Sequence, residues 1–215
     1  VKIVLADGLR EERSNSYSGS VDWTAHLGHW QANLLLEGFY TDLNHVFVLE
    51  EIGKDANGDK IKERRNGKGA RVYGVNMDAK LAHGKEAQFQ LGFTAQRSRY
   101  KTAEQWTGDD EEALFTKKMT RTPDYYGYFT FTSAPLKNFD FSLSGVYTGE
   151  MQVPHMAGYI EKSRMETSPD FLTVNLKLNY TVTLKDKVKM QFNTGIQNAF
   201  NSFQKDLDQG VMRDA

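Results

Sequence analysis

The sequence predicts an all-β chain that folds as an antiparallel transmembrane β-barrel segment, and three observations predict it. Eight stretches alternate polar and apolar residues, each stretch is longer than an ordinary strand, and the connections between them are alternately very short and very long. Successive side chains of a strand point to opposite faces, so each stretch has one apolar and one hydrophilic face. Together these features indicate a wall with lipid on one side and water on the other.

The first four stretches show the alternation most clearly. The first places Tyr17, Val21 and Trp23 on one parity and Asp22 and Thr24 on the other. The next three stretches also alternate, and each keeps its apolar residues on one parity: Leu34 and Leu36, Val75 and Met77, and Leu91 and Phe93. Each of these stretches is therefore expected to form a strand with one lipid-facing side.

The last four stretches complete the predicted sheet. The fifth is the least regular, because aromatic residues occupy both parities from Tyr125 to Phe131. The others return to strict alternation, with apolar residues at Phe141, Leu143, Leu172, Leu176, Met190 and Phe192. The eight strands are expected at 15–27, 30–43, 70–82, 86–100, 124–134, 138–149, 170–183 and 187–199.

The lengths of strands and connections favour a membrane barrel over a soluble sheet. The predicted strands have about 11 to 15 residues, whereas globular strands usually have about 5–6, and about 9–11 tilted residues cross the hydrocarbon. Short turns are expected at 28–29, 82–85, 135–137 and 184–186, and long loops at 44–69, 101–123 and 150–169. Outer-membrane barrels have short periplasmic turns and long extracellular loops, and structureless loops this long are uncommon in compact soluble domains.

Composition narrows the function classes. The chain has 215 residues, a formal net charge of -1 and no cysteine, and its mean hydropathy of -0.60 looks soluble. This low average does not exclude a membrane barrel with a water-filled interior, because half of the residues in each strand of such a barrel are polar. The absence of cysteine excludes a disulfide framework and thiolate metal sites. The near-neutral charge argues against a nucleic-acid partner.

Two loop motifs have competing interpretations. The run from Asp55 to Asp59 resembles the start of a calcium loop, but Lys60 and Asn66 stand where an EF-hand needs glycine and glutamate. We therefore expect Asn57 and Gly58 to turn a hairpin inside the long loop. A basic cluster follows, formed by Lys60, Lys62, Arg64, Arg65, Lys68 and Arg71. It could face an anionic ligand or lipopolysaccharide phosphate, although a solvated loop surface is the simpler interpretation.

Catalytic and metal-binding patterns are weak. The five histidines are scattered, and no pair has strand-compatible spacing with a third ligand. The sequence also has no nucleophile elbow and no suggestive set of serine, histidine and aspartate. The sequence thus predicts neither an enzyme nor a bound cofactor or metal.

Three segments resemble the C-terminal barrel of TonB-dependent outer-membrane receptors. Residues 9–17 look like that family's L-x-P-E-x-S-x-x-Y strand entry, with Glu11 in place of proline. Residues 195–201 are similar to its G-[IV]-x-N-L-F-[ND] run, with Ala199 in place of leucine, and residues 71–76 are similar to a mid-barrel strand start. The resemblance covers essentially the whole chain.

The resemblance implies a barrel of about 22 strands filled by an N-terminal plug. Residues 1–215 would be one partial barrel domain in the cell outer membrane, with the plug domain, the early strands and the final strand absent. The implied partners are the TonB complex, through the missing plug and TonB box, the outer-membrane lipid, and a small-molecule or metal-chelate ligand. An open sheet in lipid would leave two unpaired edges, so we expect the segment to be part of a larger assembly or a fragment taken out of its native context.

The implied function is import of a scarce nutrient complex of the siderophore, haem, cobalamin or glycan class. Candidate ligand contacts are expected where inward strand residues meet the outer loops, at Glu37, Arg97, Arg99, Tyr125 and Thr148, with Arg64 and Arg65 above them. Arginines would suit an anionic cargo. The alternatives are a passive porin-like channel and a soluble β-sandwich binding module. The sandwich would gather Trp23, Leu34, Phe93 and Leu176 in a dry core.

Overall fold

The computed structural model describes residues 2–105, 114–155, 162–184 and 188–205, and all the regular secondary structure in these ranges is β-strand. The strands are β1 (Lys2–Leu5), β2 (Arg13–Leu27), β3 (Trp30–Asn44), β4 (Phe47–Lys54), β5 (Lys60–Asn66), β6 (Ala70–His83), β7 (Ala87–Gln105), β8 (Phe115–Lys118), β9 (Tyr125–Leu136), β10 (Phe139–Thr148), β11 (Met151–His155), β12 (Arg164–Ser168), β13 (Phe171–Leu184) and β14 (Val188–Ile196). No helix in the described ranges is long and apolar enough to cross a membrane.

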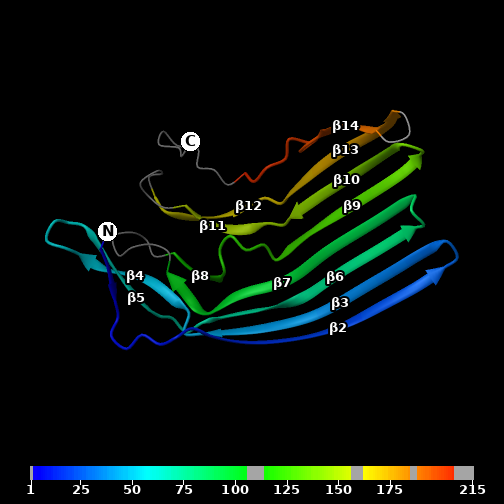
Figure 1. Cartoon of the computed structure of the whole chain (residues 1–215). Coiled ribbons are helices and arrows are strands. Elements are labelled where there is room, and N and C mark those ends of the chain that lie inside the picture. Colours follow the sequence, from blue (N-terminus) through cyan, green and yellow to red (C-terminus); the bar gives the residue numbers. More distant parts are fainter. Residues whose placement is uncertain (1, 106–113, 156–161, 185–187, 206–215) are drawn as a thin grey trace.

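Eight long strands form one curved antiparallel sheet in the order β14-β13-β10-β9-β7-β6-β3-β2, and β8 adds to the outer end of β7 (Figure 1). The eight correspond one to one to the predicted strands. The sheet is an up-and-down meander, because successive long strands along the chain are neighbours in the sheet, with β2 and β14 at its two edges. Such a meander is the arrangement from which closed barrels are built.

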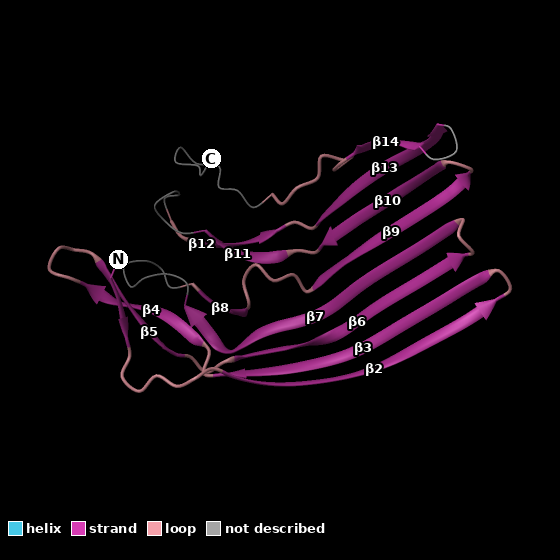
Figure 2. Cartoon of the chain, viewed as in Figure 1, coloured by secondary structure: helices cyan, strands magenta, loops and turns pink. Residues whose placement is uncertain are grey.

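The two ends of the sheet differ. Figure 2 shows tight connections at the right-hand end and all the longer excursions at the left-hand end. Gly28 and His29 form one tight turn, with Gly28 in the left-handed region at a φ of 66°. Of the turn expected at 184–186, residues 185 and 186 lie outside the described part. We call the two ends the turn end and the loop end.

The long connections contain strands of their own. The hairpin expected around Asn57 and Gly58 is confirmed, because β4 pairs with β5 and the Gly58 amide donates to the Asp55 carbonyl at 2.9 Å. The lack of structure expected at 101–123 and 150–169 is wrong in the described part. There β7 continues to Gln105 and pairs with β8, and β11 pairs with β12. Local pairing satisfies backbone groups that an extended loop would leave to water.

The apolar residues share one face of the sheet, and we call it the apolar face. One row of opposed residues across five strands is Trp23, Leu34, Ala79, Leu91 and Phe129. This face is not packed into a core, since Trp23 is 54% exposed and Phe93 is 37% exposed. An exposed apolar surface of this extent marks contact with membrane or another protein. Within the described residues the arrangement contradicts a β-sandwich, which would bury these side chains.

Candidate functional site

The opposite face of the sheet, which we call the polar face, has a row of hydrogen-bonding side chains in six neighbouring strands. The row consists of Ser20, Glu37, Asn76, Thr94, Tyr126 and Thr148. Asn76 Nδ2 donates to Glu37 Oε2 at 2.9 Å, and Thr94 Oγ1 donates to Asn76 Oδ1 at 2.9 Å. The structure therefore brings two predicted site residues, Glu37 and Thr148, into one polar row.

A second row lies one step toward the turn end of the polar face. Tyr128 Oη donates to Asp78 Oδ2 at 3.0 Å, and Gln90 Nε2 donates to Tyr128 Oη at 2.9 Å. The ring of Tyr128 lies against Gly92, where an added Cβ would come within 2.3 Å of the ring carbon Cε1. Glycine at this position lets the tyrosine lie along the wall and reach the carboxylate.

The two rows border an open groove of ≈ 720 Å³ on the polar face. Its lining includes Leu35, Asn76, Asp78, Thr94, Tyr126, Tyr128 and Thr148. These groups offer hydroxyl, amide and carboxylate hydrogen bonds beside aromatic rings. No set of three His, Cys, Asp or Glu side chains in the described ranges could hold a metal ion. The hydroxyl, amide and carboxylate groups of the lining can form hydrogen bonds with a polar ligand or surface.

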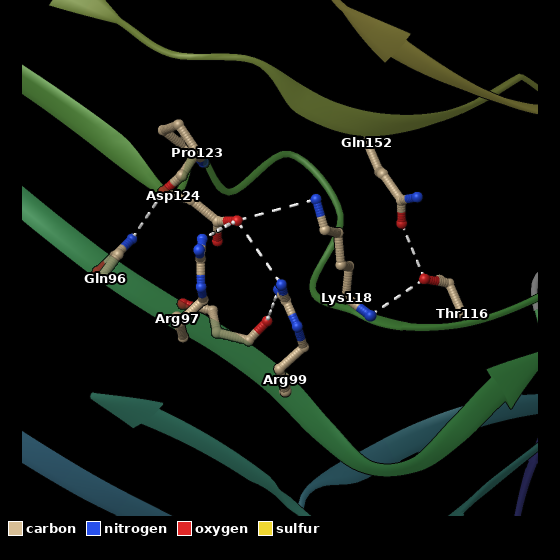
Figure 3. Close-up of polar contacts among 9 residues, drawn as sticks. Gln96, Arg97, Arg99, Thr116, Lys118, Pro123, Asp124 and Gln152 are labelled. Atoms are coloured by element: carbon tan, nitrogen blue, oxygen red, sulfur yellow. Dashed lines mark hydrogen bonds and ion pairs between the residues drawn. The ribbon is translucent and has the colours of Figure 1, made fainter. Parts of the chain in front are cut away.

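At the loop end three cationic side chains surround one carboxylate, and we call this group the Asp124 cluster (Figure 3). Arg97 Nη1 lies 2.6 Å from Asp124 Oδ2, and Arg99 Nη2 and Lys118 Nζ lie 3.6 and 3.8 Å from the same oxygen. The side chain of Asp124 is only 16% exposed, whereas those of the three cations are 31–44% exposed. One carboxylate cannot neutralise three cations, so the cluster keeps two positive charges in excess.

The β8 segment supports this cluster through the neighbouring loops. Thr116 Oγ1 donates to Gln152 Oε1 at 2.8 Å, and the amide of Arg121 donates to the Gln152 carbonyl at 2.8 Å. Gln96 fixes the start of β9, because its side-chain Nε2 donates to the Pro123 carbonyl at 3.0 Å. These contacts hold Asp124 beside the outer part of β7 (Figure 3).

The expectation that Arg97, Arg99 and Tyr125 point inward is wrong. Arg97 lies opposite Tyr73 in the register, and Tyr125 lies opposite Ala95, so both are on the apolar face. The Arg97 guanidinium carbon lies 5.7 Å from the Tyr125 ring centroid on that face. The error has a simple cause: Arg97 and Arg99 have the same odd parity as Phe93, and parity alone decides the face.

Arg64 and Arg65 lie apart from both groups, on β5 of the small sheet β1-β5-β4. Arg65 forms an ion pair with Glu50, and the hydrogen bond that its Nε donates to the Glu50 carboxylate raises the pKa of the Arg65 guanidinium. Partial burial raises the pKa of the nearby Glu104 carboxyl, although Arg65 acts in the opposite direction. The backbone carbonyl of Arg64 accepts a hydrogen bond from the Ala6 amide at 3.0 Å.

Several residues of these groups were not predicted from the sequence. Asn76 and Asp78 lie on β6 and Tyr128 lies on β9, and they gain their significance only from the register that aligns these strands across β7. Lys118 lies in the connection 101–123, which was expected to be structureless, and Asp124 was predicted only as the first residue of the fifth strand. The only sequence signal for these residues was the even parity of the polar residues on β6. This parity predicts a hydrophilic face, but it does not predict which residues of other strands will contact it.

Comparison with known proteins agrees with this geometry. The family model described as "TonB dependent receptor-like, beta-barrel" matches residues 4–199. None of the curated proteins compared with the sequence matches it.

Solved structures show the same fold at low sequence identity. The siderophore receptor PirA from Acinetobacter baumannii matches with a TM-score of 0.57 at 16% identity, over 87% of this chain and 28% of that chain. The FrpB iron transporter from Neisseria meningitidis matches with a TM-score of 0.59 at 16% identity, over 94% and 29%. The ferric-catecholate import receptor Fiu from E. coli K12 matches with a TM-score of 0.59 at 16% identity, over 89% and 24%. The chain thus spans 24–29% of the length of these three proteins.

Proposed function

Because the chain belongs to the family of TonB-dependent receptor-like β-barrels, we propose that it forms part of the wall of an outer-membrane receptor that imports a ferric siderophore. The family is one of receptors and transporters rather than enzymes. The match over residues 4–199 is the observation that carries the proposal. The printed names of the three solved structures, a siderophore receptor, an iron transporter and a ferric-catecholate import receptor, support the choice of cargo class.

In this proposal the eight long strands are one arc of a larger closed barrel. β2 and β14 each have a neighbour on only one side within the described sheet. Hydrocarbon does not hydrogen-bond to the free amides and carbonyls of a strand edge, so an open sheet is not a stable state in lipid. Further strands of the same receptor would pair with these edges, and a plug domain inside the barrel would couple it to TonB.

The polar face would line the passage and the apolar face would meet lipid. The exposed apolar residues support this orientation, since Leu36 and Tyr73 are 42% and 46% exposed on the same face. The register favours Glu37 and Thr148 over Arg97, Arg99 and Tyr125 as contacts for a ligand or plug inside the barrel. Arg64 and Arg65 would contribute positive charge on the small sheet at the loop end, which suits an anionic chelate.

Uptake of radioactive iron tests the proposal. The full-length receptor would be produced in cells that lack their own siderophore receptors, and ferric catecholate, ferric hydroxamate and haem would be supplied separately. We expect saturable uptake of a ferric siderophore that is lost when TonB is deleted. The variants Glu37→Gln and Thr148→Val should lower uptake more than Val75→Leu on the apolar face.

Two results would contradict the proposal. Uptake that continues unchanged without TonB would indicate a passive channel, which conductance of the full-length protein in liposomes would confirm. TonB-dependent uptake of haem alone, with no uptake of either siderophore, would keep the receptor function and overturn the cargo class.

A further inference from the structure

Charged residues on the apolar face are confined to the loop end. In the eight long strands, the Lys, Arg, Asp and Glu residues with apolar-face parity are Arg13, Asp42, Arg71, Arg97, Arg99 and Lys101. The remainder of that parity, down to the turn end, has no charged residue of these four types in the described strands. A charge on the lipid side of a barrel is costly at the middle of the bilayer and cheap at its surface. The charges therefore mark the outer surface of the membrane.

Tyrosines lie immediately below these charges on the same face. Tyr40 and Tyr73 are stacked, with ring centroids 6.4 Å apart, and Arg97 lies beside Tyr73 in the register. Tyr73 is 46% exposed and Tyr40 is 37% exposed. Aromatic rings of this kind collect at the headgroup level of a bilayer. Along this face, the change from tyrosine to arginine therefore lies at the level where acyl chains give way to lipid headgroups.

Three cations occupy consecutive register positions just above the tyrosines. Arg71 of β6 lies opposite Arg99 of β7, and Arg99 lies opposite Lys118 of β8. Like charges directly opposite one another in a sheet repel, and nothing in strand pairing requires them. The nearest carboxylates are Asp42, which is 3.9 Å from Arg71, and Asp124, which is 3.6 Å from Arg99. An anion seated along this row would relieve the repulsion.

The wider group keeps a clear excess of positive charge. Arg71, Arg97, Arg99, Lys101 and Lys118 form what we call the cation belt, and only Asp42 and Asp124 pair with its members in the described contacts. Lys101 Nζ already forms an ion pair with Asp42 Oδ1 at 2.5 Å, and the Lys101 side chain is 19% exposed. Arg71, by contrast, is 56% exposed. The N–H groups that could donate to a bound anion are therefore mainly those of Arg71, Arg99 and Lys118.

We propose that the cation belt binds the phosphate groups of the phosphorylated glycolipid in the outer leaflet. Arginine is suited to this ligand, because its planar guanidinium donates two parallel hydrogen bonds to a phosphate. The occupant follows from position: the belt lies on the lipid-facing side, beside the tyrosines, and not on the polar face that would line the passage. The inference rests on the proposed membrane orientation and is independent of the cargo.

Lipid binding by the full-length receptor in detergent tests this inference. Native mass spectrometry would measure the occupancy of lipid A that has its phosphates, of the same lipid after chemical dephosphorylation, and of lipid A in the presence of excess inorganic phosphate. The variant R71Q/R99Q/K118Q removes the row, and K85Q/K137Q/K189Q removes the same charge from the turn end. Because each basic residue near an anionic surface adds appreciable attraction, we expect the first variant to bind phosphorylated lipid A about tenfold or more weakly. The second variant should bind like the wild type.

Each outcome bears on the proposal. Unchanged lipid affinity in R71Q/R99Q/K118Q would overturn it, as would equal binding of phosphorylated and dephosphorylated lipid to the wild type. Displacement of lipid by millimolar-range inorganic phosphate alone would assign the belt to a free anion instead. If the row variant does not fold, as judged by heat-dependent gel mobility, the wild-type comparison of the two lipids still decides. Failure of iron uptake leaves this readout unaffected.

Discussion

Tyr73 of β6 and Arg97 of β7 lie directly opposite one another, on the apolar face of the sheet. The pair marks a boundary: below it the face has aliphatic and aromatic side chains, and above it lie Arg71 and Arg99. A cation beside an exposed aromatic ring is typical of the level where lipid meets water. This boundary gives the sheet its orientation, and the predictions below depend on it.

Neighbouring leucines on β3 should respond differently to a charge. Leu36 is 42% exposed on the apolar face, and Leu35 lines the groove on the polar face. In a barrel assembled in lipid vesicles, Leu36→Arg should lower the free energy of unfolding by about 2–4 kcal/mol, because it places a charge in hydrocarbon. Leu35→Arg, the matched control, should cost less. Equal losses in denaturant titrations would show that the apolar face does not meet lipid.

Packing on the polar face should depend on Gly92. A side chain there meets the Tyr128 ring at 2.3 Å, so Gly92→Val should displace the ring from Asp78. Overpacking of this kind costs about 1–3 kcal/mol. Gly38→Val is the control, because nothing lies within 4 Å of its added Cβ.

A double variant separates packing from other effects of Gly92→Val. Truncation of the ring in Gly92→Val/Tyr128→Ala should recover part of the lost stability, as a thermal unfolding series would show. If the double variant loses the sum of the two single losses, the contact between ring and glycine is not the cause.

The outer end of β7 should become more stable as the pH falls. Burial raises the pKa of Glu104, so the folded state takes up the proton at a higher pH than the unfolded state. The resulting stabilisation is complete below the ordinary glutamate pKa and is lost as the pH rises through the raised value. The protection factors of amides in the β7–β8 ladder, which correct for the pH dependence of exchange in an unfolded chain, should therefore rise with falling pH. Glu104→Gln should be stable at neutral pH and should flatten this dependence; an unchanged slope would assign it to another group.

The β4–β5 hairpin should depend on the Asp55 carboxylate and not on calcium. Asp55 Oδ1 accepts hydrogen bonds from the amides of Asn57 at 2.8 Å and Asp59 at 3.0 Å. Asp55→Ala removes both bonds, each with a net value of about 1 kcal/mol or less at an exposed site, and should speed proteolysis between the two strands. Asn57→Ala retains the carboxylate and should have a smaller effect. Protection that appears only with added calcium would instead favour the calcium-loop interpretation.

The fold was largely predictable because a strand in a membrane wall has a local signature. The period-two alternation from Tyr17 to Leu27 and its repeats located all eight long strands, and the Asn57-Gly58 turn was located as well. The strands β8, β11 and β12 were not predicted, because each has only four or five residues and its pairing partner is distant in sequence or in an unmarked loop. Short segments have too few residues to show a period.

The candidate site, like the fold, was predictable from the sequence only in part. Glu37 and Thr148 were chosen from their polar parity, and the register places them in one row. Arg97, Arg99 and Tyr125 were chosen for their residue types near a loop, and their parity places them on the other face. Side-chain chemistry indicates what a residue can bind, whereas strand parity decides which medium it faces.

The sequence by itself determined the strands, their two faces and the alternation of short and long connections, since all of these depend on neighbours along the chain. The tertiary structure alone decided that Arg71, Arg99 and Lys118 form one row and that Asp78 meets Tyr128. Those contacts depend on the register between strands, and a shift of one residue would move every side chain to the opposite face.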